Sequence, residues 1–257
     1  ALHQKWISTK KIIISLVFWA SFIGIWHAYS LQVPAYQLPS PGSVARTMLT
    51  IFSDVNMSRQ IMLSLMHISS AMLIAFILGS CIAVLPSLHP VSLHFVDQRL
   101  TPFLNSFSGV GWLFIAILWF GINSFTVIFA VTMVLVPFAI INLRTGLTEM
   151  DSEILELGTS LTRKKLKNFF KLVVPMLFPY AFATLRISFG VSWKVVLTAE
   201  LFGGSGGMGY MLNKARQEFE TEIIFAIITY MILFVILSEL IVFNLVQKSL
   251  DKRYHVE

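Results

Sequence analysis

The class of fold is decided by residues 223–246, which read IIFAIITYMILFVILSELIVFNLV. Glu239 is the one charged residue in this stretch. A helix needs about 20 mostly apolar residues to cross the hydrocarbon core of a bilayer. Because no water is present there to bond the backbone, a helix is the structure that a single such segment adopts. The stretch therefore predicts a membrane-spanning helix.

The composition of the whole chain supports a membrane protein. Of its 257 residues, 56% are hydrophobic and 12% are charged, whereas about 25% are charged in ordinary soluble domains. The mean hydropathy is +0.77. So few charges cannot cover so much apolar surface in water. These values exclude a disordered chain and a nucleic-acid-binding domain, and the single cysteine excludes a secreted disulfide scaffold.

Further apolar stretches bring the expected number of membrane spans to about six. They predict an all-α polytopic membrane protein, in which residues 1–257 form a single transmembrane domain. The first stretch is too long for the apolar core of a cleaved signal peptide, so we expect it to be retained. The predicted spans cover residues 12–31, 61–85, 104–120, 124–141, 176–197 and 223–246.

The basic residues predict how the spans are oriented. The net charge is +6, and Lys and Arg gather on the cytoplasmic side of membrane proteins. With both termini in the cytoplasm, the cytoplasmic segments hold 13 of the 19 basic residues and the outside segments hold four. Arg186 and Lys194 remain, and both fall inside the fifth span. The distribution therefore favours cytoplasmic termini.

The cytoplasmic loop of residues 149–172 has the pattern of a short amphipathic helix. Acidic residues come first and basic residues follow, an order that suits the helix dipole. Ile154, Leu157 and Leu161 form one apolar stripe at helical spacing. Such a helix either lies on lipid headgroups or docks in the groove of a partner protein. The residue pattern by itself allows both interpretations.

Several short motifs follow one another from about residue 35 to residue 250. In chain order they are Leu38-Pro39-Ser40-Pro41, Trp119-Phe120-Gly121-Ile122, Glu156-Leu157-Gly158 with Val173-Val174-Pro175, Leu185-Arg186-Ile187, and Ala199-Glu200-Leu201 with Gly207-Met208-Gly209-Tyr210. Together they resemble the permease subunits of binding-protein-dependent ABC importers, in the nitrate, sulfonate and taurine branch. The third motif resembles their "EAA" loop, although the family's glycine falls here on Thr162.

The resemblance implies a function and a set of partners. The chain would be the membrane-spanning subunit of an ATP-driven importer in a bacterial inner membrane. It would form a homodimer that works with two cytoplasmic ATPase subunits and an outside solute-binding protein. The resemblance favours docking over lipid for the loop, and the ATPase-coupling residues that it implies are Glu156, Leu157, Gly158, Leu161 and Thr162.

The chain itself is not expected to be an enzyme. It has no G-x-x-x-x-G-K-[ST] motif, so ATP and Mg would be bound by the partner ATPase and this chain would hold no cofactor. No set of metal-ligand residues at a suitable spacing predicts a metal site. Residues 204–209 contain a G-x-G-x-x-G string, but it follows a membrane span and faces outside, so we expect a turn and not a nucleotide site.

Charged and aromatic residues in the spans are candidates for the translocation path. Arg186 and Lys194 are costly in lipid and should face protein or a cavity. We expect Lys194 to favour an anion such as a sulfonate, nitrate or carboxylate, unless its side chain extends to the membrane surface. Arg186 is a candidate either for the path or for a pair with another span. Ser108 is expected either in close helix contact or in a cavity wall. Trp112 and Trp193 are expected either as anchors at the membrane interface or in a cavity wall.

Other functions remain alternatives at this stage. A permease for a neutral or cationic aromatic precursor would suit the abundant aromatic residues. A secondary transporter would not need a docking helix, and the inverted repeat found in many such folds is not evident here. An intramembrane enzyme would need a set of reacting groups at membrane depth. His67, Glu200 and Glu239 show no such pairing at helical spacing, and His67 is expected to hydrogen-bond between helices.

Overall fold

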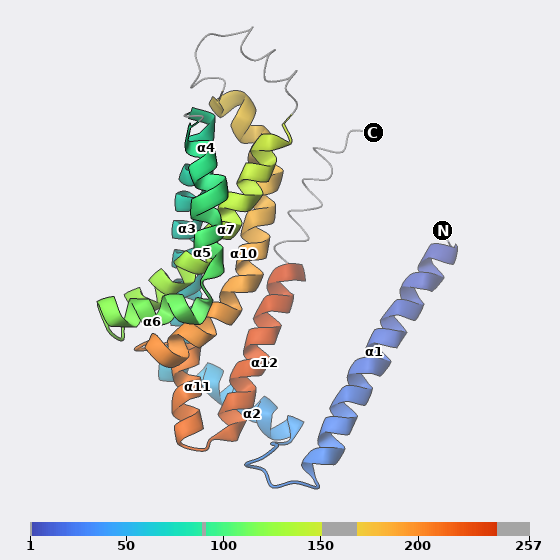
Figure 1. The fold of residues 1–257 in the computed structure, drawn as a ribbon. Coiled ribbons are helices and arrows are strands. Elements are labelled where there is room, and N and C mark those ends of the chain that lie inside the picture. Colours follow the sequence, from blue (N-terminus) through green and yellow to red (C-terminus); the bar gives the residue numbers. More distant parts are fainter. Residues whose placement is uncertain (1, 89–90, 151–168, 241–257) are drawn as a thin grey trace. The chain divides into compact units, whose positions relative to one another are not determined.

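The computed structural model describes residues 2–88, 91–150 and 169–240, and every regular element in them is a helix. The chain forms two compact units: residues 1–58 with 212–232, and residues 59–211 with 233–257. The elements, labelled in Figure 1 where there is room, are α1 (Leu2–Ser30), α2 (Pro41–Ser53), α3 (Val55–Leu88), α4 (Val91–Phe95), the π-helix η1 (Val96–Leu100), α5 (Thr101–Ser106), α6 (Gly109–Phe120), α7 (Ser124–Thr148), the π-helix η2 (Phe169–Val173), α10 (Val174–Gly203), α11 (Met208–Gln217) and α12 (Thr221–Ser238).

Four helical stretches of the described residues are long and apolar enough to cross a membrane. They are Val55–Pro86, Ser124–Thr148, Phe169–Gly203 and Thr221–Ser238, and a bent pair of helices would make a fifth. The predicted all-α polytopic membrane fold is thereby confirmed. Helix α1 also runs through the first predicted span and ends at Ser30.

The third apolar stretch, predicted as a short span over residues 104–120, contains a break between two helices. Helix α5 ends at Ser106, Phe107 takes an extended conformation, and α6 begins at Gly109. The hydroxyl of Ser108 accepts a hydrogen bond from the backbone N–H of Gly111 at 3.1 Å and so caps α6. The helical stretches on either side of this break are bent by 81°, and Figure 1 shows α6 turned across the direction of α5. A local cap therefore interrupts a sequence that is apolar enough to continue.

The core of the second unit is built around α7. Val127, Ala130, Val131 and Leu135 of this helix are completely buried, and α5, α6 and α10 all pack against it. Gly79 of α3 approaches α7 so closely that an added Cβ would overlap the side chain of Ala139. Close approach of backbones at small residues is a common way for membrane helices to associate.

The first unit joins α1, α2 and the beginning of α12. The indole N–H of Trp26 donates to the carbonyl of Pro39 at 3.0 Å, and the ring of Trp26 lies 6.0 Å from that of Phe225. The hydroxyl of Tyr230 donates to the carbonyl of Met48 at 2.6 Å. These contacts join α1 to the segment before α2, and join both α1 and α2 to the beginning of α12.

Candidate functional site

The predicted ATPase-coupling residues, Glu156, Leu157, Gly158, Leu161 and Thr162, lie outside the described residues. The structure does describe the start of their loop. Glu149 follows the last residue of α7, and its carboxylate accepts a hydrogen bond from the hydroxyl of Tyr180 on α10 at 2.6 Å. The start of the loop is therefore tied to the helix that follows it.

Lys194 lies on α10 with its side chain exposed, whereas the preceding residues Ser192 and Trp193 are buried. Ser192 and Trp193 therefore lie on the packed side of α10, and Lys194 lies on its open side. None of the ion pairs among the described residues includes Lys194. The structure thus presents an ammonium group on the open side of an apolar helix.

Arg186, on the same helix, is paired with a carboxylate. Its guanidinium donates to Glu239, the residue that follows α12. The side chains of Arg186 and Glu239 are 33% and 42% exposed. The two charges that the sequence places in the fifth span are therefore in different electrostatic surroundings.

The aromatic candidates are packed inside the second unit. The ring of Trp193 stacks on Phe234 of α12 with centroids 5.6 Å apart, and Trp112 packs against Phe107 at 5.0 Å. Both indole N–H groups are buried and have no hydrogen-bond partner among the described residues. Ser108, the remaining candidate, is exposed and caps α6.

The structure also forms a polar cluster that helical spacing could not reveal. His67 on α3 and Glu200 near the end of α10 are both fully buried, and Nδ1 of His67 lies 2.8 Å from Oε1 of Glu200. The hydroxyl of Ser64 donates to Oε2 of Glu200 at 2.7 Å. These groups are distant in the sequence, so a search within one helix cannot pair them. The pairing confirms that His67 hydrogen-bonds between helices.

The glycine-rich segment 204–209 closes around this carboxylate. The N–H of Gly209 donates to Oε2 of Glu200 at 2.9 Å, and the N–H of Met208 donates to the hydroxyl of Ser64 at 2.7 Å. The N–H of Gly207 donates to the side chain of Gln60 at 2.7 Å. The segment thus gives Glu200 one backbone donor, from Gly209, and its other two N–H groups bond Ser64 and Gln60 on α3.

Only glycine fits two positions of this segment. Gly207 has φ +107°, and a Cβ there would overlap the carboxylate of Glu200. A Cβ at Gly209 would overlap the carbonyl of Leu197. A buried carboxylate needs such donors because an uncompensated charge inside a protein is very costly. We therefore interpret the cluster as an anchor that joins α3, α10 and α11.

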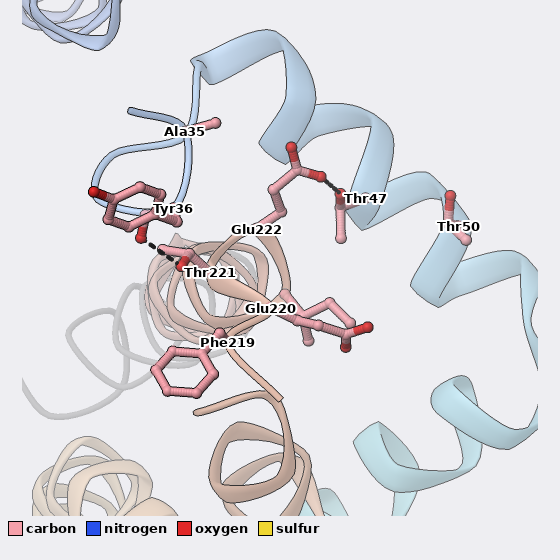
Figure 2. A pocket seen from close by; sticks show the side chains of 9 residues that line it. Ala35, Tyr36, Thr47, Thr50, Phe219, Glu220, Thr221 and Glu222 are labelled. Atoms are coloured by element: carbon pink, nitrogen blue, oxygen red, sulfur yellow. Dashed lines mark hydrogen bonds between the residues drawn. The ribbon is translucent and has the colours of Figure 1, made fainter. Parts of the chain in front are cut away.

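A pocket of about 440 Å³ lies in the first unit (Figure 2). Glu222 accepts a hydrogen bond from Thr47 at 3.2 Å, and Thr221 donates to the carbonyl of Tyr36 at 2.7 Å. The lining residues are Ala35, Tyr36, Thr47, Thr50, Phe219, Glu220, Thr221, Glu222 and Ile223. None of them is basic and two are carboxylates, so this pocket does not suit an anion.

The described residues hold charged groups both in a buried cluster and in accessible positions. They contain no group of three His, Cys, Asp or Glu side chains that could hold a metal ion. The His67–Glu200 cluster contains a buried acid and a possible base, but its hydrogen bonds tie helices together. The charges left accessible in the second unit's apolar helices include Lys194 and the Arg186–Glu239 pair.

Comparison with known proteins identifies the family. Residues 12–256 match the family described as "Binding-protein-dependent transport system inner membrane component", and the chain belongs to that family. It is a permease subunit of a binding-protein-dependent ABC importer. The family implies a solute-binding protein and an ATPase as partners and a place in the inner membrane.

Individual relatives match most of the chain. The putative aliphatic sulfonates transport permease protein SsuC of Bacillus subtilis is 26% identical over 209 residues, which are 80% of this chain and 75% of SsuC. The taurine transport system permease protein TauC of Escherichia coli is 24% identical, over 93% of this chain and 89% of TauC. The bicarbonate transport system permease protein CmpB of Synechococcus elongatus is 28% identical, over 84% of this chain and 82% of CmpB.

Proposed function

We propose that this permease carries a small anion, such as a sulfonate, nitrate or carboxylate. The observation that carries the proposal is Lys194, an exposed ammonium group on an apolar helix. A charge at such a place is tolerated when it faces a water-filled cavity or a partner charge. The relatives named for aliphatic sulfonates, taurine and bicarbonate support an anionic solute.

The open side of α10 supports a path shared by two copies of the chain. Only 17% of the most apolar part of the Phe169–Gly203 stretch is buried within one chain. Closed two-fold symmetry is the commonest arrangement of identical subunits. In the proposed homodimer, the two α10 helices contribute Lys194 to a central cavity, and both termini of each chain lie in the cytoplasm.

The ATPase subunits would drive this path through the loop of residues 149–172. The loop follows α7 and leads through η2 into α10, and α10 carries Lys194. Because α7 and α10 pack together and Glu149 is bonded to Tyr180, displacement of the loop would be transmitted to α10. Nucleotide binding can then shift the path only if the loop has a different position in each nucleotide state.

The experiment is uptake by the assembled importer with Lys194→Met, using radiolabelled taurine, nitrate and bicarbonate as probes. Uptake should fall by roughly tenfold or more, because the loss of one charged contact has that order of effect. Association with the ATPase should be retained. Lys214→Met is the matched control, since Lys214 is exposed on α11 and lies 3.9 Å from Glu218. Unchanged uptake in Lys194→Met would show that the ammonium group of Lys194 extends to the membrane surface and does not attract the solute.

A further inference from the structure

Arg186 is attached to the middle of an apolar helix. Helix α10 has 30 residues, from Val174 to Gly203. At 1.5 Å per residue, Arg186 lies roughly 18 Å from the beginning of the helix and roughly 26 Å from its end. An ionisable side chain at such a depth, with a carboxylate partner on another helix, marks a functional site by default.

The ion pair between Arg186 and Glu239 is open on one side. Both side chains keep a third or more of their surface accessible, whereas the His67–Glu200 pair in the same unit is completely buried. A pair that only held helices together would be expected to be sealed by its neighbours. Contact with lipid would leave the charges poorly solvated, so the open side of the Arg186–Glu239 pair is expected to face water.

The two helices remain in contact without this ion pair. Trp193 lies seven residues after Arg186, and therefore within about 20° of the same side of α10. Its ring stacks on Phe234 of α12, at an interplanar angle of 13°. Trp193 is buried, with 2% of its surface exposed. This apolar contact lies within the second unit and joins the last residues of α12 to α10, so the carboxylate of Glu239 can leave Arg186 while Phe234 stays packed on Trp193.

We propose that Glu239 is an internal substitute for the solute, and that the incoming anion takes its place on Arg186. This inference rests on the proposed anion import. It assigns to Glu239 the role of balancing the charge of the translocation path. Arg186, Lys194 and Glu239 together carry one net positive charge, which one monovalent anion neutralises. Lys194 attracts the anion, and Arg186 receives it when Glu239 moves away. Glu239 keeps the guanidinium compensated while the path is empty.

Three variants separate this exchange from a purely structural ion pair. In the assembled importer, Glu239→Gln should support anion uptake at or above the normal rate, because the internal competitor is removed. Arg186→Gln should reduce uptake by roughly tenfold or more, as expected when a charge-assisted hydrogen bond is lost. The double variant should assemble with the ATPase and yet take up as little anion as Arg186→Gln. A purely structural ion pair predicts the opposite result. Each single variant would then lower anion uptake, and the double variant would restore it.

A labelling experiment tests the same inference without transport. In a Cys81→Ser background, which removes the one native thiol, Glu239→Cys should react with charged methanethiosulfonate reagents in membranes that contain the full complex. The anionic sulfonatoethyl reagent should react faster than the cationic trimethylammonium reagent by roughly tenfold, because local charge steers an ionic reagent. Arg186→Gln should remove that preference. Absence of labelling, or equal rates with both reagents while Arg186 is present, would overturn the inference.

The two experiments also distinguish this inference from the proposed function. Nitrate or taurine should slow the labelling of Glu239→Cys when the anion occupies Arg186. If the normal complex imports none of the tested anions while labelling keeps its charge preference and is slowed by nitrate, anion import is wrong and the anion site stands. If uptake of anions is normal and Glu239→Gln abolishes it, import stands and the exchange is wrong.

Discussion

The side chain of Glu200 is buried and has three hydrogen-bond partners. Ser64, His67 and the N–H of Gly209 all contact its carboxylate, and its side chain is completely buried. Ser64 and His67 both belong to α3, whereas Gly209 belongs to the beginning of α11. The cluster therefore fixes one end of α10 to α3 and α11 through buried hydrogen bonds.

Removal of the carboxylate should destabilise the protein much more than neutralisation of the half-exposed Glu239. Glu200→Ala leaves His67 and Ser64 buried without their acceptor, and breaking a buried pair costs about 3–5 kcal/mol. Glu239→Gln affects a pair that is 33% and 42% exposed, so a smaller loss is expected. The measurement is the apparent unfolding temperature of each purified variant. Equal shifts would show that Glu200 is not a structural anchor.

The backbone of the glycine-rich segment should be equally sensitive. Gly207→Ala places a Cβ against the carboxylate of Glu200 and forces a non-glycine residue to φ +107°. Strained backbone of this kind costs about 1–3 kcal/mol before the overlap is counted. Gly190→Ala is the control, because an added Cβ there meets no atom within 4 Å. Thermal unfolding should therefore distinguish the two alanine variants, and a stable Gly207→Ala would contradict the described cluster.

At the scale of elements, the break between α5 and α6 shows how one residue redirects an apolar stretch. The sequence on both sides could continue as a helix, yet Ser108 takes an extended conformation and bonds the N–H of Gly111. Its hydroxyl is thereby engaged in helix capping. The position of Ser108 in the third span suggested that it contacts the solute. Its hydroxyl oxygen would then have to cap α6 and contact the solute at the same time.

Ser108→Ala should lower stability by about 1 kcal/mol, the usual cost of losing an N-cap. Ser108→Asp should restore most of that loss, since an aspartate side chain caps equally well. Uptake measured against solute concentration should keep the same half-saturation in both variants. A changed half-saturation with unchanged unfolding would place Ser108 in the translocation path instead.

Substitutions in the apolar stripe of residues 149–172 test whether this segment is the coupling helix. Leu161→Asp introduces a charge among Ile154 and Leu157, and the loss of a buried interface leucine costs roughly 2 kcal/mol or more. Glu156→Lys reverses the charge that the sequence predicts near the helix start. Both variants should uncouple uptake from ATP hydrolysis while the permease still folds. Thr159→Asp, which lies opposite the apolar stripe of the predicted helix, is the control for Leu161→Asp. Full ATPase association and uptake in both test variants would place the docking element elsewhere.

At the scale of the whole molecule, one chain leaves large apolar surfaces uncovered. Ile187 and Phe202 of α10 are 44% and 53% exposed, and α10 also carries the exposed Lys194. Lipid can cover the apolar side chains of such a helix, but it does not compensate the ammonium group. A second copy of the chain would cover the apolar side chains and would enclose Lys194 in a shared cavity, where water can solvate its ammonium group.

A cysteine at Leu201, near the end of α10, should therefore cross-link two copies of the chain. In the Cys81→Ser background, oxidation of Leu201→Cys should give a covalent dimer. The yield should not change when the protein is diluted with lipid, because a stable dimer does not depend on chance encounters. The measurement is the dimer fraction on a non-reducing gel at several lipid-to-protein ratios. A strictly monomeric complex in lipid and in detergent would contradict the homodimer.

The sequence by itself determined the class of this protein. Its long apolar stretches require helices, because a bilayer leaves the backbone no other donors and acceptors. The order of the short motifs also predicted a binding-protein-dependent permease, and the match of residues 12–256 confirmed it. These properties depend on local composition and on the order of motifs, and the linear sequence contains both.

Only the tertiary structure decided how the polar residues within the helices are used. His67 meets Glu200 across 133 positions, and Arg186 meets Glu239 across 53. Periodicity relates residues of the same helix and contains no information about which helices will be neighbours. The glycine-rich string looked like an ordinary turn because the carboxylate that it surrounds is brought to it by packing. The physical reason is that pairing of charges in an apolar medium follows distance in space, and packing alone sets that distance.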